Sequence, residues 1–396
     1  MTLELSKKLS TISPSVTLAI TAKANAMKAE GIDVISFGAG EPDFNTPVFI
    51  QDAGIDAIKT GKTRYTPASG LKTLKEAICN KLKSDNDLEY TPSNIVVSNG
   101  AKHSIYNTLN AILNEGDEVI VPVPYWVSYP ELVKLAGGEP KLVQVREEDH
   151  FKYTIELLNE ALTNKTKAIF VNSPNNPTGT AYSKEELILI GEWAVKNEVF
   201  ILSDEIYEKL VYDGTKHISI ASLNKAIKEQ TIVINGMSKA YAMTGWRIGY
   251  TAANEEITKM MSNFQSHATS NPCSISQYAS IKALNTETDE IEKMRQSFEK
   301  RRNIMVDLIN ELPNVSCNKP LGAFYVMANI SKWIGKEING IKINSSVEFA
   351  SVLLNDKNVA VIPGAAFGDD RYIRLSYAIS EDAIREGIDR INTFLK

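Results

Sequence analysis

The sequence predicts an α/β protein with a mostly parallel β-sheet covered by helices on both faces, followed by a smaller α+β block. Short β-branched runs alternate with longer helical patterns through much of the chain, as in sheets of this kind. The 396 residues exceed one ordinary domain, and 43% hydrophobic against 23% charged residues can bury a sizeable core. The alternation stops near residue 280, so a second domain is expected there.

Seven apolar runs are the expected strands of the sheet. They lie at residues 94–98, 118–123, 141–145, 167–172, 199–203, 231–235 and 247–252. A helix is expected over residues 184–196, because Ser183-Lys-Glu-Glu186 has the capping-box pattern that starts a helix.

The rest of the chain predicts the α+β block. A long helical stretch begins near residue 280 and includes the charged run Glu299–Arg302. Three more apolar runs follow, at residues 323–327, 359–362 and 372–377, and an amphipathic helix is expected over residues 381–395.

Composition excludes several classes of function. The formal net charge of -5 is spread without blocks of like charge, so nucleic acid is not an expected partner. Three distant cysteines and four histidines form no metal-binding pattern, and we expect neither a metal site nor a disulfide framework. No apolar run approaches the ~18 residues of a membrane span, and the N-terminal stretch lacks the apolar core of a signal peptide. The expected location is the cytoplasm.

Polar residues follow the expected strands where ligands bind in open α/β sheets. The first strand leads into Asn99-Gly-Ala-Lys102 and then a helix, which would aim backbone N–H groups at an anion. The run at 167–172 leads into Ser173-Pro-Asn-Asn-Pro-Thr-Gly179, a proline-stiffened turn that carries two amides, Asn175 and Asn176.

Two further strands end in ionisable groups. The run at 199–203 is followed by Asp204-Glu-Ile-Tyr207, and the run at 231–235 by Gly236-Met-Ser-Lys239 and later Arg247. Taken singly, Asp204 could cap a helix, and Lys239 could be a solvated loop residue. Taken together, these residues match pyridoxal phosphate (PLP), which needs a lysine, a carboxylate for its ring nitrogen, donors for its phenolate oxygen and a phosphate site.

Other motifs do not support a different activity. SxxK, SDN and KTG patterns occur at Ser69, Ser84 and Lys59, but their order differs from that of serine β-lactamases. The segment Gly38-Ala-Gly40 does not complete a dinucleotide-binding GxGxxG motif.

The chain resembles the PLP-dependent class I aminotransferases, and within them subgroup I gamma, the branch of the bacterial aspartate aminotransferases. The stretch Gly236–Gly249, with Ser238-Lys239 and Arg247, fits their lysine-site pattern. Further matching segments occur in the expected order over nearly the whole chain: Gly40–Phe44, Arg64–Tyr65, Pro124–Tyr129, Asn172–Gly179, Ser203–Tyr207, Gly322–Tyr325 and Ile373–Ser376.

The resemblance implies a PLP fold of type I and a role for each matching residue. Lys239, Asp204 and Tyr207 would be catalytic: Lys239 would carry the cofactor, Asp204 hold its ring nitrogen and Tyr207 its phenolate oxygen. The other implied cofactor contacts are Gly100, Ala101, Lys102, Trp126, Asn176, Ser238 and Arg247, with Tyr65 reaching in from the second subunit of a dimer. The implied substrate contacts are Gly40, Trp126, Asn176 and Arg374 for the α-carboxylate end, and Lys102, Ser15 and Thr17 for the distal carboxylate. Lys239 would have to be partly neutral, an effect that nearby Arg247 would favour.

The expected domains are a large PLP-binding domain at residues 47–285 and a small domain made of residues 1–46 and 286–396. The expected reaction converts L-aspartate and 2-oxoglutarate to oxaloacetate and L-glutamate, in a homodimer whose active sites are shared through Tyr65 and residues 265–270. Transamination of alanine, aromatic amino acids or prephenate, and a PLP-dependent C–S β-lyase activity, stay open as alternatives. Some members of the branch use prephenate, a trait linked to basic residues at the position of Lys102 and near position 13. Because this chain keeps Lys102 but has Ser13, we expect weak prephenate activity or none.

Overall fold

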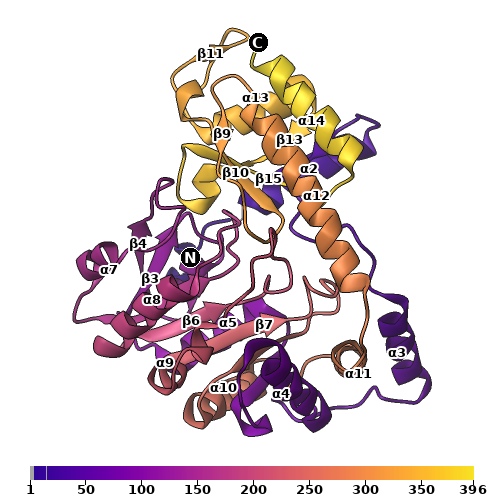
Figure 1. Ribbon diagram of the computed structural model, residues 1–396, viewed down its shortest axis with the longest axis vertical. Helices are drawn as coiled ribbons and strands as arrows, with labels where there is room; N and C mark the ends of the chain where they lie inside the picture. Colours follow the sequence, from indigo (N-terminus) through magenta and orange to yellow (C-terminus); the bar gives the residue numbers. More distant parts are fainter. Residues whose placement is uncertain (1–3, 15) are drawn as a thin grey trace.

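The computed structural model describes residues 4–14 and 16–396, and over these residues its largest sheet has seven strands (Figure 1). Their order is β2-β8-β7-β6-β5-β3-β4, with β2 (Ile95–Ser98), β3 (Glu118–Val123), β4 (Glu139–Gln144), β5 (Thr166–Asn172), β6 (Phe200–Asp204), β7 (Thr231–Gly236) and β8 (Gly249–Ala252). The ladders from β4 through β7 are parallel, and β8 runs antiparallel to β2 and β7. The expected mostly parallel sheet is therefore confirmed.

Helices cover both faces of this sheet because successive strand residues point to opposite sides. In β5, Phe170 packs in one hydrophobic cluster with Ile105, and the next residue back, Ile169, packs in another with Leu187. The first face carries α5 (Ala101–Ile112), α6 (Tyr129–Leu135) and α10 (Glu255–Ala268). The other carries α4 (Lys72–Asn86), α7 (Ile155–Ala161), α8 (Lys184–Lys196) and α9 (Lys225–Gln230), with α3 (Val48–Lys59) and α11 (Ser274–Leu284) beyond α4. Across the described residues, no helix combines the length and apolarity needed to cross a membrane.

The expected capping box opens α8. The Ser183 hydroxyl accepts a hydrogen bond from the N–H of Glu186, and the Glu186 carboxylate accepts one from the N–H of Ser183. Both bonds satisfy N–H groups that the first helical turn leaves without partners.

The C-terminal block has its own sheet, in the order β14-β15-β10-β9. Its strands are β9 (Ser316–Cys317), β10 (Tyr325–Asn329), β14 (Ile362–Pro363) and β15 (Tyr372–Ser376). The helices α12 (Glu290–Asn310), α13 (Ser346–Lys357) and α14 (Glu381–Phe394) pack with β9, β10 and β15 in one hydrophobic cluster. The long helical stretch expected from about residue 280 is two helices rather than a continuous one. Residues 285–289 separate α11 from α12, so the chain leaves the large sheet at this break and enters the C-terminal block.

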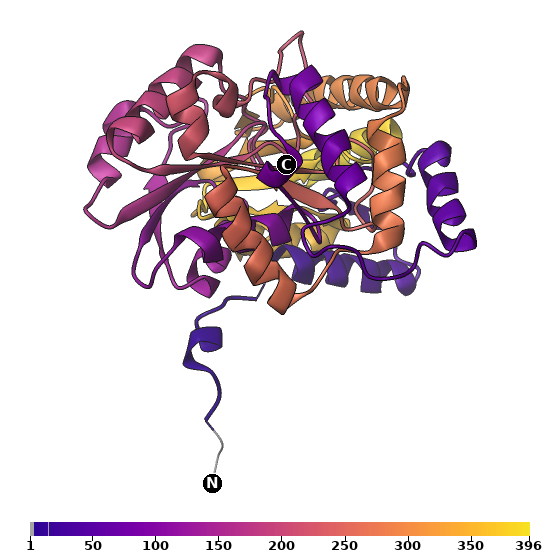
Figure 2. The same ribbon diagram turned by 90° about the horizontal axis from the view of Figure 1, so that it is seen from below.

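The N-terminal segment joins the C-terminal block. After α2 (Val16–Ala29), β1 (Ile35–Ser36) pairs in parallel with β13 (Val359–Ala360). Before α2, α1 (Lys7–Ser10) lies below the large sheet and contacts α6 (Figure 2). The division into domains at residues 47 and 285 stays a prediction.

Candidate active site

A pocket of about 670 Å³ lies at the carboxyl ends of the parallel strands, under the C-terminal block. Expected site residues that line it are Thr17, Gly40, Ala101, Lys102, Trp126, Asn176, Asp204, Tyr207, Ser238, Lys239, Arg247 and Arg374. Of the other expected site residues, Gly100 does not line the pocket but directly precedes Ala101 as the N-cap residue of α5, and the Tyr65 side chain is 90% exposed on the surface. Ser15 lies outside the described residues. Residues from eight separate segments therefore meet in one pocket, and those that follow β2, β3, β5, β6 and β7 lie where ligands bind in open α/β sheets.

Asp204 ends β6 at the bottom of the pocket. A turn follows it, so the alternative in which it caps a helix does not apply. Its Oδ2 accepts a 2.6 Å hydrogen bond from the Tyr129 hydroxyl, and Oδ1 accepts a weaker one of 3.3 Å from the N–H of Ile206. Burial raises the pKa of Asp204 to about 6, although both hydrogen bonds oppose the shift. The carboxylate is thus held in a place where a nearby cation would stabilise its charge.

Lys239 lies in the turn after β7, above Asp204. Its Nζ donates a 2.5 Å hydrogen bond to the carbonyl of Gly40 and lies 5.6 Å from the ring centre of Phe324. Desolvation lowers the pKa of Lys239 to about 8; Glu41 opposes the shift, while Arg374 and Arg247 add to it. Arg247 therefore acts in the expected direction, but burial is the main cause. A lysine of this pKa is neutral often enough to act as a nucleophile or a base.

Arg374 lies in β15 on the opposite wall and is only 4% exposed. Its Nη1 donates a 3.0 Å hydrogen bond to Oδ1 of Asn176, its guanidinium lies 4.3 Å from the ring centre of Tyr325, and its Nε has no hydrogen-bond partner. No ion pair neutralises Arg374 among residues 4–14 and 16–396, and burial lowers its pKa. A buried, incompletely bonded guanidinium is suited to bind a carboxylate from a ligand.

Tyr207 and Asn176 lie between Asp204 and Arg374. The hydroxyls of Tyr207 and Tyr325 are 3.1 Å apart, and burial raises the pKa of Tyr207, so this phenol stays protonated and can donate. The N–H of Asn176 donates a 2.9 Å hydrogen bond to Oδ1 of Asn172, whose amide nitrogen donates to the carbonyl of Asp204. Asn172 therefore ties the turn of Asn176 to the strand end of Asp204.

The start of α5 shares the pocket with Ser238 and Arg247 and has features that suit an anion. Its cap residue Gly100 has a φ of +85° and no side chain to bond the first helical N–H groups. A Cβ on Gly100 would lie 2.4 Å from Nη2 of Arg247, so only glycine lets the guanidinium approach this closely. Helix N-termini with free N–H groups bind phosphate readily.

Trp126 and Lys102 close one side of the pocket. The indole packs edge-to-face on Tyr129 with ring centres 5.3 Å apart, and Nζ of Lys102 lies 5.0 Å from its ring centre. Burial, with a smaller effect of Arg247, lowers the pKa of Lys102. Thr17 lines the same pocket from α2.

The structure also differs in part from the sequence-based expectation. Asn175 was expected at the rim beside Asn176, but its Oδ1 accepts hydrogen bonds from the N–H and hydroxyl of Thr178 and stabilises the turn instead. Tyr129, Asn172 and Tyr325 were not assigned a role, although each lines the pocket. A buried asparagine at a strand end, such as Asn172, is the signal that could have been used.

A family model and full-length relatives of known name all match this chain to the same protein family. A family model described as aminotransferase class I and II matches residues 32–391. An aspartate aminotransferase of Bacillus sp. (strain YM-2) is 53% identical over 99% of both chains, and one of Bacillus subtilis is 51% identical over 100% of this chain and 99% of the relative. An aspartate/prephenate aminotransferase of Cereibacter sphaeroides is 46% identical over 98% of both chains.

Solved structures agree with these relatives. The aspartate aminotransferase from Rhizobium meliloti superposes with a TM-score of 0.96 at 41% identity and covers 100% of this chain and 99% of its own. The aspartate aminotransferase from Thermus thermophilus with maleate superposes with a TM-score of 0.94 at 38% identity over 100% of both chains.

Proposed function

The chain belongs to the class I and II aminotransferase family, and we propose that it uses PLP to convert L-aspartate and 2-oxoglutarate to oxaloacetate and L-glutamate. One observation carries the proposal: the amine of Lys239, with a pKa of about 8, shares a pocket with the buried carboxylate of Asp204. The names of the full-length relatives at 50–53% identity support aspartate as the amino donor.

The residues present fit PLP at both ends of that molecule. The uncapped start of α5, with Ser238 and Arg247, suits a phosphate, and Gly100 leaves room for the guanidinium there. Asp204 suits a protonated ring nitrogen, because a cation would offset the cost of its buried charge. Tyr207 and Asn176 would donate to the phenolate oxygen, and Trp126 would stack on the ring.

The chain's own residues would perform the proton transfer. PLP, when bound, supplies an aldehyde for the Lys239 amine and a ring that accepts the electron pair left when the substrate Cα loses its proton. Lys239, as a free amine, would take that proton from Cα as a general base. Asp204 would hold the ring nitrogen protonated, and Tyr207 would donate its hydroxyl proton to the phenolate oxygen.

The substrate would be held at both carboxylates. Arg374, steadied by Asn176, would bind the α-carboxylate with its two-pronged guanidinium, together with the backbone of Gly40. Lys102 and Thr17 line the pocket where the distal carboxylate would lie, and Ser15 completes the set that we propose for it.

We also propose that the enzyme is a cytoplasmic homodimer with shared active sites. Tyr65 is 90% exposed, far more than is usual for a tyrosine, and would be covered by insertion into the second subunit's site.

A panel of amino donors tests the proposed substrate. We expect kcat/KM with 2-oxoglutarate to be far higher for L-aspartate than for L-alanine or aromatic amino acids, and prephenate with an amino donor to react weakly or not at all. A higher value for alanine, an aromatic amino acid or prephenate, or formation of a thiol from cystathionine, would replace aspartate transamination by the corresponding alternative.

A further inference from the structure

The segment that carries Asp204 and Tyr207 has a second, buried face. Asp204, Ile206 and Tyr207 line the pocket, whereas Glu205 and Glu208 point to the other side, where they are 1% and 7% exposed. Residues 206–209 form a turn outside the sheet. Strand pairing therefore fixes Asp204 and the backbone of Glu205, whereas the turn beyond them depends on other contacts.

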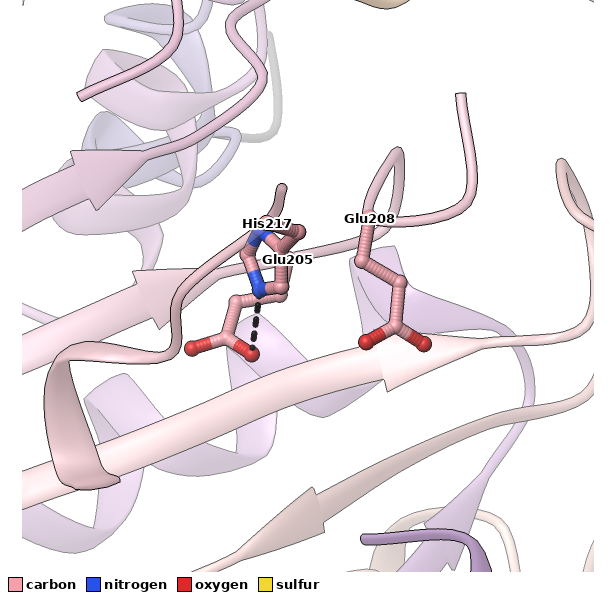
Figure 3. Close-up of side chains that lie close together, drawn as sticks. All are labelled: Glu205, Glu208 and His217. Atoms are coloured by element: carbon pink, nitrogen blue, oxygen red, sulfur yellow. Dashed lines mark hydrogen bonds and ion pairs between the residues drawn. The ribbon is translucent and has the colours of Figure 1, made fainter. Parts of the chain in front are cut away.

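Glu205 is held by three donors. Its Oε1 accepts hydrogen bonds from the hydroxyls of Ser203 and Ser219 at 2.8 and 2.6 Å, and its Oε2 lies 3.1 Å from Nε2 of His217. Figure 3 shows His217 and Glu205 joined, with the carboxylate of Glu208 beside them. These three contacts fix the side chain of Glu205, the residue that directly follows Asp204.

Glu208 is held by α4. Its Oε1 forms an ion pair with Nζ of Lys81, and its Oε2 accepts a 2.8 Å hydrogen bond from the amide of Asn86, which also accepts one of 2.7 Å from Lys81. Burial would raise the pKa of Glu208, but Lys81, His217 and Asn86 lower it to about 2. The ligand atoms of Glu205, Glu208 and His217 lie within 4.8 Å of one another, but the Lys81 ammonium already provides the cation at Glu208.

We propose that Lys81 and Glu208 are positioning residues for the reaction: their buried ion pair fixes the back of the turn at residues 206–209 and thereby places Tyr207 relative to Asp204. Glu208 directly follows Tyr207, and its N–H donates a 2.9 Å hydrogen bond to the carbonyl of Glu205, so a shift of Glu208 moves Tyr207 against the strand end that carries Asp204. An apolar pair of similar size would serve stability as well as a buried ion pair does, whereas fixed directional contacts serve position. This inference rests on the proposed function of the site.

The test replaces the pair by the apolar double variant Lys81→Met/Glu208→Leu, which leaves no unpaired buried charge but removes both hydrogen bonds of the buried Asn86 amide. Because replacing a buried ion pair is often neutral for stability, we expect the apo protein to unfold cooperatively, at a urea concentration lowered only by the loss of the Asn86 hydrogen bonds. We expect kcat to fall ~10- to 100-fold, as small displacements of reacting groups do, with a smaller change of KM for aspartate. The pH titration of the bound cofactor's absorbance should also shift, because it reports on Asp204 and Tyr207 without turnover.

A matched control is Arg302→Met/Asp213→Leu. It removes the ion pair between the fully buried Arg302 and Asp213, and neither of these residues lines the pocket. We expect this control to keep the wild-type kcat and titration. Wild-type kcat and titration in the Lys81/Glu208 variant, or equal losses in the control, would overturn the positioning role. If the double variant does not fold, Glu208→Gln, which keeps the shape and the contact with Asn86, gives the same readouts. Failure of the wild-type protein to bind PLP or transaminate would refute the proposed function instead.

Discussion

The hydroxyl of Tyr129 lies 2.6 Å from Oδ2 of Asp204, and both side chains are buried. Tyr129 is itself fixed by stacking on Phe170, whose ring centre is 4.1 Å away, and by the edge of Trp126. The pKa of Asp204 is about 6 even with this hydrogen bond, so Tyr129 is the residue that keeps the carboxylate from becoming neutral near physiological pH.

The variant Tyr129→Phe removes this donor and keeps the ring. A hydrogen bond to a charged group is worth ~1.5–3 kcal/mol, so the pKa of Asp204 should rise by about one to two units. We expect the affinity of the apo protein for PLP to fall about tenfold at pH 7 and less at pH 9, where Asp204 is charged in both apo proteins before the cofactor binds. PLP titrations of the apo protein from pH 6 to 9 check this. A loss of affinity that is the same at every pH would assign Tyr129 a packing role only.

The variant Asp204→Asn separates activity from stability. The folded pKa of about 6 lies above the ordinary value of 3.8, so the folded apo protein binds the additional proton between these values. Asp204 therefore destabilises the apo protein progressively as pH rises from 4 to 6, by roughly 3 kcal/mol in total. We expect the asparagine variant to lack this loss in urea unfolding at pH 4 to 7, while its kcat falls by orders of magnitude. A less stable variant with normal kcat would mean that Asp204 serves the fold.

Shared active sites predict that two inactive variants complement each other. Tyr65→Ala and Lys239→Ala protomers, mixed and allowed to exchange, form hybrid dimers in which one site has both native residues. We expect about a quarter of the wild-type activity after random exchange, because half of the dimers are hybrid and one of their two sites is intact. Sedimentation of the same samples should show dimers. No recovery of activity, or an active monomer in dilute solution, would show that Tyr65 does not act across subunits.

Lys102 is expected to decide the preference for dicarboxylates. In Lys102→Ala, kcat/KM should fall far more for aspartate than for alanine, because a lost charged contact is worth ~1.5–3 kcal/mol and alanine has no distal carboxylate. The Lys102 ammonium lies 5.0 Å from the Trp126 ring centre, so PLP affinity should be measured alongside. Equal losses for both substrates would place Lys102 at the phosphate and leave the preference to other residues.

The sequence predicted the large sheet well because buried parallel strands form continuous apolar runs. All seven runs became strands with boundaries within two residues, and Ser183 marked the start of α8. The break between α11 and α12 was missed because residues 285–289 contain neither glycine nor proline, only polar residues that helices tolerate.

The residues that face the pocket were also more predictable than the residues that hold them in place. Asp204, Tyr207, Lys239 and Arg374 follow from strand ends and from the family's motifs. The contacts of Tyr129 with Asp204 and of Lys81 with Glu208 span 75 and 127 positions, so no local pattern reveals them. Asn175 and Asn176 are equivalent in sequence, and only the fold of their turn decides which one faces the pocket.

Lys239 and Asp204 are proposed to form a transaminase site for L-aspartate. A single half-reaction tests this: the PLP-reconstituted protein is mixed with L-aspartate alone, and the absorbance of the Lys239-bound cofactor is followed together with the product. We predict that this absorbance is lost and that one equivalent of oxaloacetate forms per site, whereas Lys239→Ala folds, holds PLP without a covalent bond and gives no oxaloacetate. Unchanged absorbance with aspartate, or oxaloacetate from the Lys239→Ala variant at the wild-type rate, would contradict the account.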